Sequence, residues 1–420
     1  ILGVAQDGGT MVDTVGYSTR EIVALIRGAK GTSVTIRIKQ PNTPDSSART
    51  VTIVRDVIKQ EDSGVHHRVI EVPYDGGIKR VGVLEIPSFY LNFTARRSGV
   101  GADEYRSVSL DTEKAIKALN EQNIDGMVVD LRNNPGGSLD EVARMLGLFI
   151  KEGPLVQIRD NKGNVQVFVD RDGGEQLYAG DMAVLINLGS ASASEIFSAA
   201  IQDYGRGLVV GSTTTGKGSA QVQRDDLALG SMTLTQRKFY RITGGSTQNK
   251  GVVPDVPLVN IYEGIEFGER EYKNPLEWDT ITTTPFMAHG KYSKDLMASI
   301  IASSQARQQR DPQFKYLTAL NDIRAMDDDK KPADVSIDKR RAKRELIEQK
   351  TLAAENARRQ ATGEMPFTNW STYQASMDAL AEERSLMKEN ERPRLPESEA
   401  FVIEAATLMF EAKDKKTLVE

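Results

Sequence analysis

Cysteine is absent from this 420-residue chain, and histidine occurs only at His66, His67 and His289. The lack of cysteine excludes disulfide bonds and thiolate metal sites, although it leaves the redox compartment open. No histidine lies beside a serine motif, so a hydrolase built on a Ser–His pair is not indicated. A nucleophilic serine in this chain would need a different base.

A long apolar stretch and an excess of positive charge are also missing. Hydrophobic residues make up 39% of the chain, and 54 Lys and Arg stand against 59 Asp and Glu, for a net charge of −5. No membrane span is expected from this pattern, and nothing in the charge favours nucleic acid or anionic membranes as partners. Residues 1–5 lack an initiator Met and a basic targeting segment, so we expect a fragment or mature portion whose true N-terminus lies upstream.

Three regions follow one another along the chain, which predicts a multidomain α/β (α+β) protein. Residues 1–55 predict a small module, residues 56–265 a mixed α/β core, and residues 266–420 a mainly helical domain. In the core, apolar strands alternate with helical segments. The last region is rich in Ala, Glu, Lys, Arg and Gln with charged runs, which is typical of helices with a solvated face.

The small module begins with a strand at residues 1–5 and continues with a short helix that ends near residue 26. Ser18 followed by Glu21 is the pattern of a capping box, which predicts the start of this helix. Two alternating segments at 33–38 and 49–54 predict strands.

Two loops of small residues in the core each follow an apolar strand and precede a helix. The first loop spans residues 133–137, after an apolar strand expected at 126–131. The second spans residues 189–192, after a strand expected at 183–188, and Gly205 is expected to end the helix that follows it. Open α/β sheets place their sites at the carboxyl ends of strands, and the first N–H groups of a helix are free to hold an anion. A serine of the second loop could therefore attack a carbonyl while N–H groups of Gly137 and Ala193 hold the oxyanion. The alternative is a tight turn with a capping serine and a small-residue packing face.

Lys217 is the base that this chain offers in place of histidine. It lies between Gly216 and Gly218, so no neighbouring side chain hinders its approach to another group. A lysine accepts a proton only when it is neutral, and burial can lower a lysine pKa by roughly 3–5 units. Gln221, four residues further on, could hydrogen-bond the lysine and orient it. Taken singly, each of these two residues more often lies on a solvated surface.

A phosphate-binding loop is a competing interpretation of the same segment. Residues 211–217 fit the first seven positions of that motif, but the eighth is Gly218 in place of Ser or Thr. The residues that follow alternate like a strand, whereas a phosphate-binding loop opens a helix. We therefore regard nucleotide hydrolysis as the weaker hypothesis.

The combined motifs resemble the C-terminal processing (tail-specific) peptidases, a Ser–Lys family. The resemblance covers about residues 1–265, and the helical remainder is similar to the longer bacterial members. The matching segments are 130–137, 189–197, 216–218 with Gln221, and 250–255.

The resemblance implies a role for each candidate residue. Serine and lysine of the family are 25 positions apart, as are Ser192 and Lys217, which selects Ser192 from the run Ser190, Ser192, Ser194. Ser192 would then be the nucleophile, Lys217 the general base and Gln221 its orienting partner. The N–H groups of Gly137 and Ala193 would form the oxyanion hole.

The resemblance further implies a periplasmic serine endopeptidase without cofactor or metal. Its partners would be protein substrates with apolar C-terminal tails and, as in some relatives, an adaptor protein. The family carries a PDZ domain, of which residues 1–55 match only the later half. The strand that would hold a substrate's terminal carboxylate is expected upstream of Ile1. A catalytically silent PDZ-type scaffold is the alternative from another class.

Overall fold

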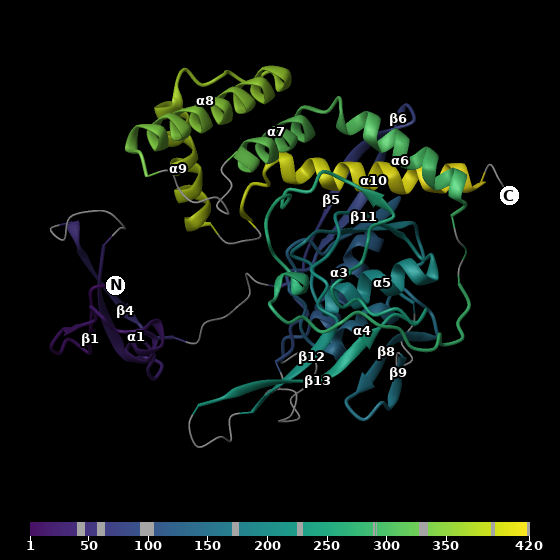
Figure 1. Cartoon of the computed structure of the whole chain (residues 1–420), viewed down its shortest axis with the longest axis horizontal. Coiled ribbons are helices and arrows are strands. Elements are labelled where there is room, and N and C mark those ends of the chain that lie inside the picture. Colours follow the sequence, from purple (N-terminus) through teal and green to yellow (C-terminus); the bar gives the residue numbers. More distant parts are fainter. Residues whose placement is uncertain are drawn as a thin grey trace. The chain divides into compact units, whose positions relative to one another are not determined.

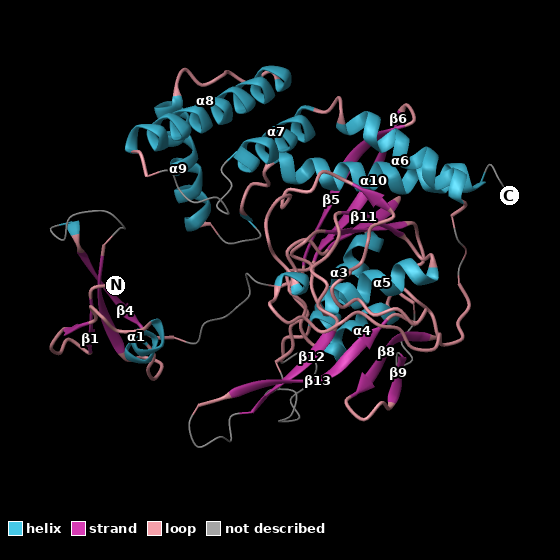
Figure 2. Ribbon diagram, in the orientation of Figure 1, coloured by secondary structure: helices cyan, strands magenta, loops and turns pink. Residues whose placement is uncertain are grey.

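The computed structural model describes residues 1–39, 47–56, 64–92, 105–169, 176–224, 230–288, 290, 292–326, 335–387 and 391–417. They form two compact units, one that ends at residue 56 and one that begins at residue 64. Both combine strands with helices, and the second unit ends in a series of helices (Figures 1 and 2). The predicted fold class, mixed α/β with a helical C-terminal region, is confirmed.

The N-terminal unit is a four-stranded antiparallel sheet with one helix. The strands, in sheet order, are β2 (Val12–Asp13), β1 (Gly3–Gln6), β3 (Ser33–Ile38) and β4 (Arg49–Val54). Helix α1 (Thr19–Ile26) begins with the predicted capping box: the backbone N–H of Glu21 donates to Ser18 Oγ at 3.4 Å, and that of Ser18 donates to Glu21 Oε2 at 2.7 Å. Assignment of this unit to a PDZ module stays a prediction.

A six-stranded sheet forms the centre of the second unit. Its order is β14 (Val256–Pro257), β11 (Leu208–Gly211), β10 (Met182–Ile186), β7 (Gly126–Asp130), β6 (Gly77–Glu85) and β5 (His66–Tyr74). All neighbours are parallel except β5 and β6. Because β7 and β10 are adjacent and parallel, the two loops that follow them meet at one edge of the sheet.

The central strands β10, β7 and β11 are apolar except for Asp130 at the end of β7, because both faces of the sheet are covered. In β7, Met127 and Val129 contribute to the core on one face, whereas Val128 contributes to the core on the other. The first core contains residues of α3 (Val108–Glu121), α4 (Leu139–Gly147) and α5 (Ala193–Tyr204). The second contains residues of α6 (Lys294–Gln308), α7 (Pro312–Met326) and α10 (Pro396–Thr417), and Figure 1 shows α10 beside β5 and β11.

A second, antiparallel sheet has the order β12 (Ser219–Arg224), β13 (Met232–Tyr240), β8 (Pro154–Asp160) and β9 (Val165–Val169). Strand β12 begins two residues after Lys217, where a phosphate-binding loop would open a helix. The backbone after Lys217 therefore lacks the geometry on which the nucleotide interpretation depends.

The C-terminal region also contains α8 (Ile337–Thr362), α9 (Trp370–Leu386) and a short 3₁₀ helix at Glu269–Glu271. Ion pairs fasten α6 to α10: Arg307 contacts Glu404 at 2.9 Å and Glu411 at 2.6 Å. Within the described ranges, no helix combines the length and apolar character that crossing a bilayer requires.

Candidate active site

The three serines in and just after the second loop, Ser190, Ser192 and Ser194, have different surroundings. Ser190 is fully buried; its hydroxyl donates to the carbonyl of Leu131 at 2.8 Å and accepts the N–H of Asn187 at 3.0 Å. Ser194 is also fully buried, and its hydroxyl donates to the carbonyl of Asn134 at 2.9 Å. Ser192 is only half-buried, and among the described contacts its hydroxyl, unlike those of Ser190 and Ser194, donates no hydrogen bond. Ser192 is therefore the serine whose hydroxyl is available for chemistry.

The backbone at Ser192 has an uncommon conformation. Its φ of 56° and ψ of −110° lie in a region that side chains with a Cβ rarely adopt, and it directly precedes α5. Such a conformation costs of order 1–3 kcal/mol and is common at catalytic positions, where a sharp strand-to-helix turn exposes a nucleophile. The surrounding hydrogen bonds hold Ser192 in this strained turn.

The buried carboxylate of Glu195 joins the second loop, residues 189–192 (the serine loop), to residues 212–218 (the lysine loop). Oε2 of Glu195 accepts the backbone N–H of Ser192 at 2.8 Å and that of Lys217 at 2.8 Å, so the two nitrogens are separated by at most twice that distance. Oε1 accepts the hydroxyl of Thr214 at 2.6 Å and the N–H of Gly216 at 2.7 Å. The structure therefore places the predicted nucleophile and the predicted base on adjacent backbone segments.

The lysine loop is also held from its other side. The carboxamide oxygen of the fully buried Gln248 accepts the N–H of Gly218 at 2.9 Å, and the N–H of Asn249 donates to the carbonyl of Gly216 at 2.8 Å. The side chain of Lys217 is half-buried, and no hydrogen bond joins its Nζ to Ser192 Oγ among the described contacts. These contacts hold the backbone of the lysine loop, whereas no hydrogen bond or ion pair of the Lys217 ammonium is found among the described contacts.

The first loop, residues 133–137 (the glycine loop), lies against the start of α5. A Cβ added at Gly136 would lie 2.8 Å from Cβ of Ser192 and 2.9 Å from the nitrogen of Ala193, so this approach requires glycine. Gly137 is exposed, with φ of 149°, and a Cβ there would meet the carbonyl oxygen of Phe89 at 2.2 Å. Neither the N–H of Gly137 nor that of Ala193 donates to another group within the described ranges. Two free N–H donors therefore lie in loops that contact each other beside Ser192.

No hydrogen bond joins Gln221 to Lys217 among the described contacts. Gln221 is exposed on β12 and pairs with Thr235 on β13, and its Nε2 lies 3.4 Å from Thr235 Oγ1. The register of β12 shifts between Ala220 and Gln221, which marks an irregularity at this point of the strand. The predicted orienting role of Gln221 stays a prediction.

Glu195 and Gln248, which hold the serine and lysine loops through hydrogen bonds, were not predicted from the sequence as site residues. Glu195 follows Ser192 by three positions, and this Ser-x-x-Glu spacing before an apolar helix is a signal that could have identified it. Gln248 carries no comparable local signal, because its partner Gly218 lies 30 positions earlier in the chain.

Burial raises the pKa of the Glu195 carboxyl to about 7, although the hydroxyl of Thr214 and the backbone N–H groups of Ser192, Gly216 and Lys217 oppose the rise. Glu195→Gln is expected to remove most of the activity, because a carboxamide has one acceptor oxygen and turns two N–H groups toward these donors. Each buried donor left without an acceptor costs about 1–3 kcal/mol. Hydrolysis rates and urea denaturation curves measure the two effects.

The pH dependence of stability gives an independent check on Glu195. Its carboxyl titrates near 4.5 when unfolded and near 7 when folded, so the folded chain binds this proton more tightly. The resulting stabilisation is complete below about pH 4.5 and is lost as the pH rises through about 7. Glutamine does not titrate, so wild type should lose unfolding free energy relative to Glu195→Gln over this interval. A difference that stays constant with pH would contradict the raised pKa.

Comparison with known proteins identifies the class. Residues 80–258 match the model of peptidase family S41, and residues 262–414 match that of the C-terminal domain of tail specific protease. The chain belongs to the S41 family of tail-specific (C-terminal processing) peptidases, as its motifs predict.

Two curated relatives agree with this classification, and one solved structure is similar to part of the chain. A tail-specific protease of Haemophilus influenzae is 33% identical over 425 residues, which cover 99% of this chain and 56% of that protein. A probable CtpA-like serine protease of Staphylococcus epidermidis is 33% identical over 245 residues, 58% of this chain and 44% of that protein. The solved structure of the photosystem II D1 C-terminal processing protease is 27% identical, covers 61% of this chain and 62% of its own, and gives a TM-score of 0.39. The chain spans about half the length of the curated relatives it matches.

Proposed function

We propose that this protein is a serine endopeptidase that cleaves protein substrates engaged through their C-terminal tails. Ser192 is the nucleophile and Lys217 the general base, with Gln221 as the residue that orients the lysine. The N–H groups of Gly137 and Ala193 form the oxyanion hole.

One observation carries this proposal. Of Ser190, Ser192 and Ser194, Ser192 alone donates no hydrogen bond from its hydroxyl among the described residues, and its backbone N–H shares an acceptor oxygen with that of Lys217. A purely structural small-residue turn does not require a strained serine whose hydroxyl donates to no other group. Because the two backbone N–H groups share this acceptor, Ser192 lies within one side-chain length of the Lys217 backbone.

The geometry supports acyl transfer in two stages. Ser192 Oγ attacks the carbonyl carbon of the scissile bond and gives its proton to neutral Lys217 Nζ. The N–H groups of Gly137 and Ala193 stabilise the tetrahedral oxyanion, and the C–N bond then breaks as the lysine returns the proton to the departing amine. Water hydrolyses the acyl-enzyme with Lys217 again as base, which regenerates Ser192.

Family membership supports the rest of the proposal. A bacterial tail-specific protease would act in the periplasm, on substrates with apolar C-terminal tails, and with an adaptor protein as in some relatives. Strand addition is the binding mode that suits an extended peptide, because main-chain hydrogen bonds provide affinity and side-chain pockets provide selectivity. The partial PDZ module within residues 1–55 would contribute one wall of the tail-binding groove.

The test is incubation of the whole chain with a disordered protein that has an apolar C-terminus, followed by mass spectrometry of the products. New peptides that appear with wild type and not with Ser192→Ala support the peptidase. Binding of the substrate without cleavage by either protein would instead favour the catalytically silent scaffold.

A further inference from the structure

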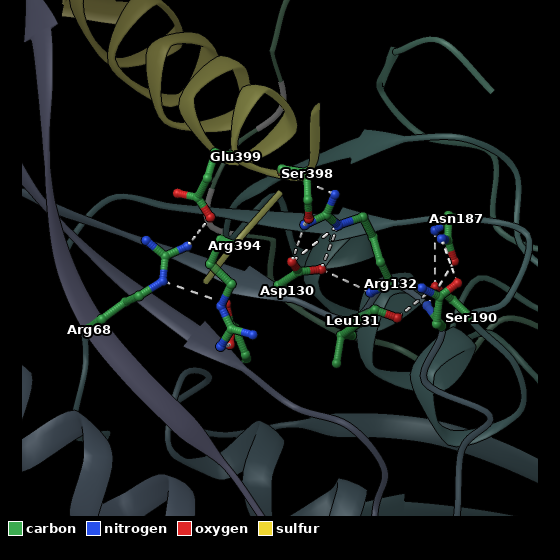
Figure 3. A network of polar contacts seen from close by, with 11 residues as sticks. Arg68, Asp130, Leu131, Arg132, Asn187, Ser190, Arg394, Ser398 and Glu399 are labelled. Carbon is green, nitrogen blue, oxygen red and sulfur yellow. Dashed lines mark hydrogen bonds and ion pairs between the residues drawn. The ribbon is translucent and has the colours of Figure 1, made fainter. Parts of the chain in front are cut away.

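A network of charged side chains lies at the carboxyl ends of β6 and β7, directly before the glycine loop (Figure 3). Glu85 and Asp130 are register partners on these neighbouring parallel strands, so their carboxylates are close together. Burial raises the pKa of Glu85, and the charge of Asp130 adds to the rise. The remaining members are three arginines and one glutamate: Arg68, Arg132, Arg394 and Glu399. Three acidic and three basic groups thus balance one another.

Arg132 makes contacts on two sides. Its Nη2 donates to Asp130 Oδ2 at 2.6 Å and its Nε to Asp130 Oδ1 at 3.0 Å. On the other side, Nη1 donates to the carbonyl of Ser398 at 3.3 Å and Nη2 to its hydroxyl at 3.1 Å, although Ser398 lies 266 positions away in the sequence. The guanidinium carbon is 5.3 Å from the ring centroid of Phe401. Arginine alone presents this many donors in one rigid plane.

The backbone just after Arg132 holds the serine loop in place. The carbonyl of Asn134 accepts the N–H of Ala191 at 3.0 Å and the hydroxyl of Ser194 at 2.9 Å, so it is bonded to one residue on each side of Ser192. A displacement of this backbone would therefore move Ser192 as well. Figure 3 shows the side chain of Arg132 directed toward Ser398, with Leu131 and Ser190 in contact at the other end of the network.

A second contact from the C-terminal region reaches the same loop. The hydroxyl of Tyr262 donates to Asn133 Oδ1 at 2.5 Å. Asn133 in turn exchanges two hydrogen bonds of 2.9 Å with Asn187, which directly follows β10 and leads into the serine loop. Tyr262 and Ser398 both belong to the segment matched by the C-terminal-domain family model. Two independent contacts from that domain thus converge on residues that support Ser192.

We propose that Arg132 is a positioning residue through which the start of α10 holds the glycine loop and the serine loop in the geometry that catalysis requires. The C-terminal domain is then part of the active-site support. This inference rests on the proposed function of Ser192 as nucleophile. Arg132 itself touches no reacting atom, and it acts through the backbone of residues 133–137.

Arg132→Lys tests the proposal, because lysine keeps the charge beside Asp130 but cannot form the planar fork to both partners. A misplacement of about 1 Å in a catalytic group costs about 10²-fold, so a fall in kcat of roughly 10- to 100-fold with little change in KM is expected. The second readout is the rate at which a small fluorophosphonate labels Ser192, in which Oγ displaces fluoride from phosphorus. This probe needs no tail recognition, and its rate should fall in parallel with kcat.

Arg307→Lys is the matched control, since it weakens another arginine fork to α10, at Glu404 and Glu411, that does not contact the two loops. It should lower the melting temperature comparably and leave the labelling rate unchanged. Ser398→Ala removes one bond from the far side of Arg132 and should slow labelling less, with the fold intact. If Arg132→Lys does not fold, the labelling rate of Ser398→Ala tests the positioning role of Arg132 in its place.

The outcomes separate the two proposals. Labelling of Arg132→Lys at the wild-type rate overturns the positioning role, as does an equal slowing in Arg307→Lys, which would indicate general destabilisation. Where Arg132→Lys does not fold, labelling of Ser398→Ala at the wild-type rate overturns it equally. Absence of labelling and of hydrolysis in the wild-type chain overturns the proposed function instead, and the positioning role falls with it.

Discussion

Ser192→Ala is expected to reduce hydrolysis to background and to leave the melting temperature unchanged. The hydroxyl of Ser192 donates no hydrogen bond within the described residues, and alanine retains the Cβ, so the backbone strain at φ of 56° stays the same. Loss of the nucleophile from a serine-hydrolase site costs about 10⁶-fold in kcat. Turnover of a disordered protein substrate and thermal denaturation measure the two quantities.

The neighbouring serines, Ser190 in the same loop and Ser194 at the start of α5, provide matched controls. Ser190→Ala leaves the carbonyl of Leu131 and the N–H of Asn187 without their buried partner, which is expected to cost about 1–3 kcal/mol. Ser194→Ala removes one bond to the carbonyl of Asn134. Both variants should keep substantial activity at temperatures where they are folded. A folded but inactive Ser190→Ala beside an active Ser192→Ala would show that the nucleophile has been assigned to the wrong residue.

Lys217→Arg is expected to be about as inactive as Lys217→Ala. The base must be neutral to accept the proton of Ser192, and arginine keeps its proton at any ordinary pH. Loss of general-base catalysis lowers the rate by about 10²- to 10⁴-fold. In both variants the backbone N–H at position 217 still donates to Glu195, so the loop should remain folded. The measurement is kcat of the three proteins over a range of pH.

Lys250→Arg controls for the change of side chain itself. Lys250 is exposed, and its ammonium lies 3.2 Å from the ring centroid of Trp278, an interaction that arginine also makes. This variant should retain full activity. If Lys217→Arg were substantially active as well, Lys217 could not be the general base, and another proton acceptor would have to be found.

Local patterns in the sequence were sufficient to place the two site loops. The apolar segments 126–131 and 183–188 predict strands that the structure places at Gly126–Asp130 and Met182–Ile186. Small residues after each strand predict turns into helices, and Gly205 has the left-handed conformation expected after α5. The alternation after Lys217 predicts β12. These features depend on a few neighbouring residues, which is why sequence reasoning could reach them.

The sequence by itself therefore determined the elements, the loops and the candidate residue types, because periodicity and turn chemistry are local properties of the chain. Only the tertiary structure decided how these residues meet. It buried the hydroxyls of Ser190 and Ser194, left that of Ser192 without a group to donate to among the described residues, and paired Gln221 with Thr235. It also brought Ser398 to Arg132 across 266 positions of sequence. Such contacts follow from the order of strands in the sheet and from the helices that cover its faces, and no local pattern records them.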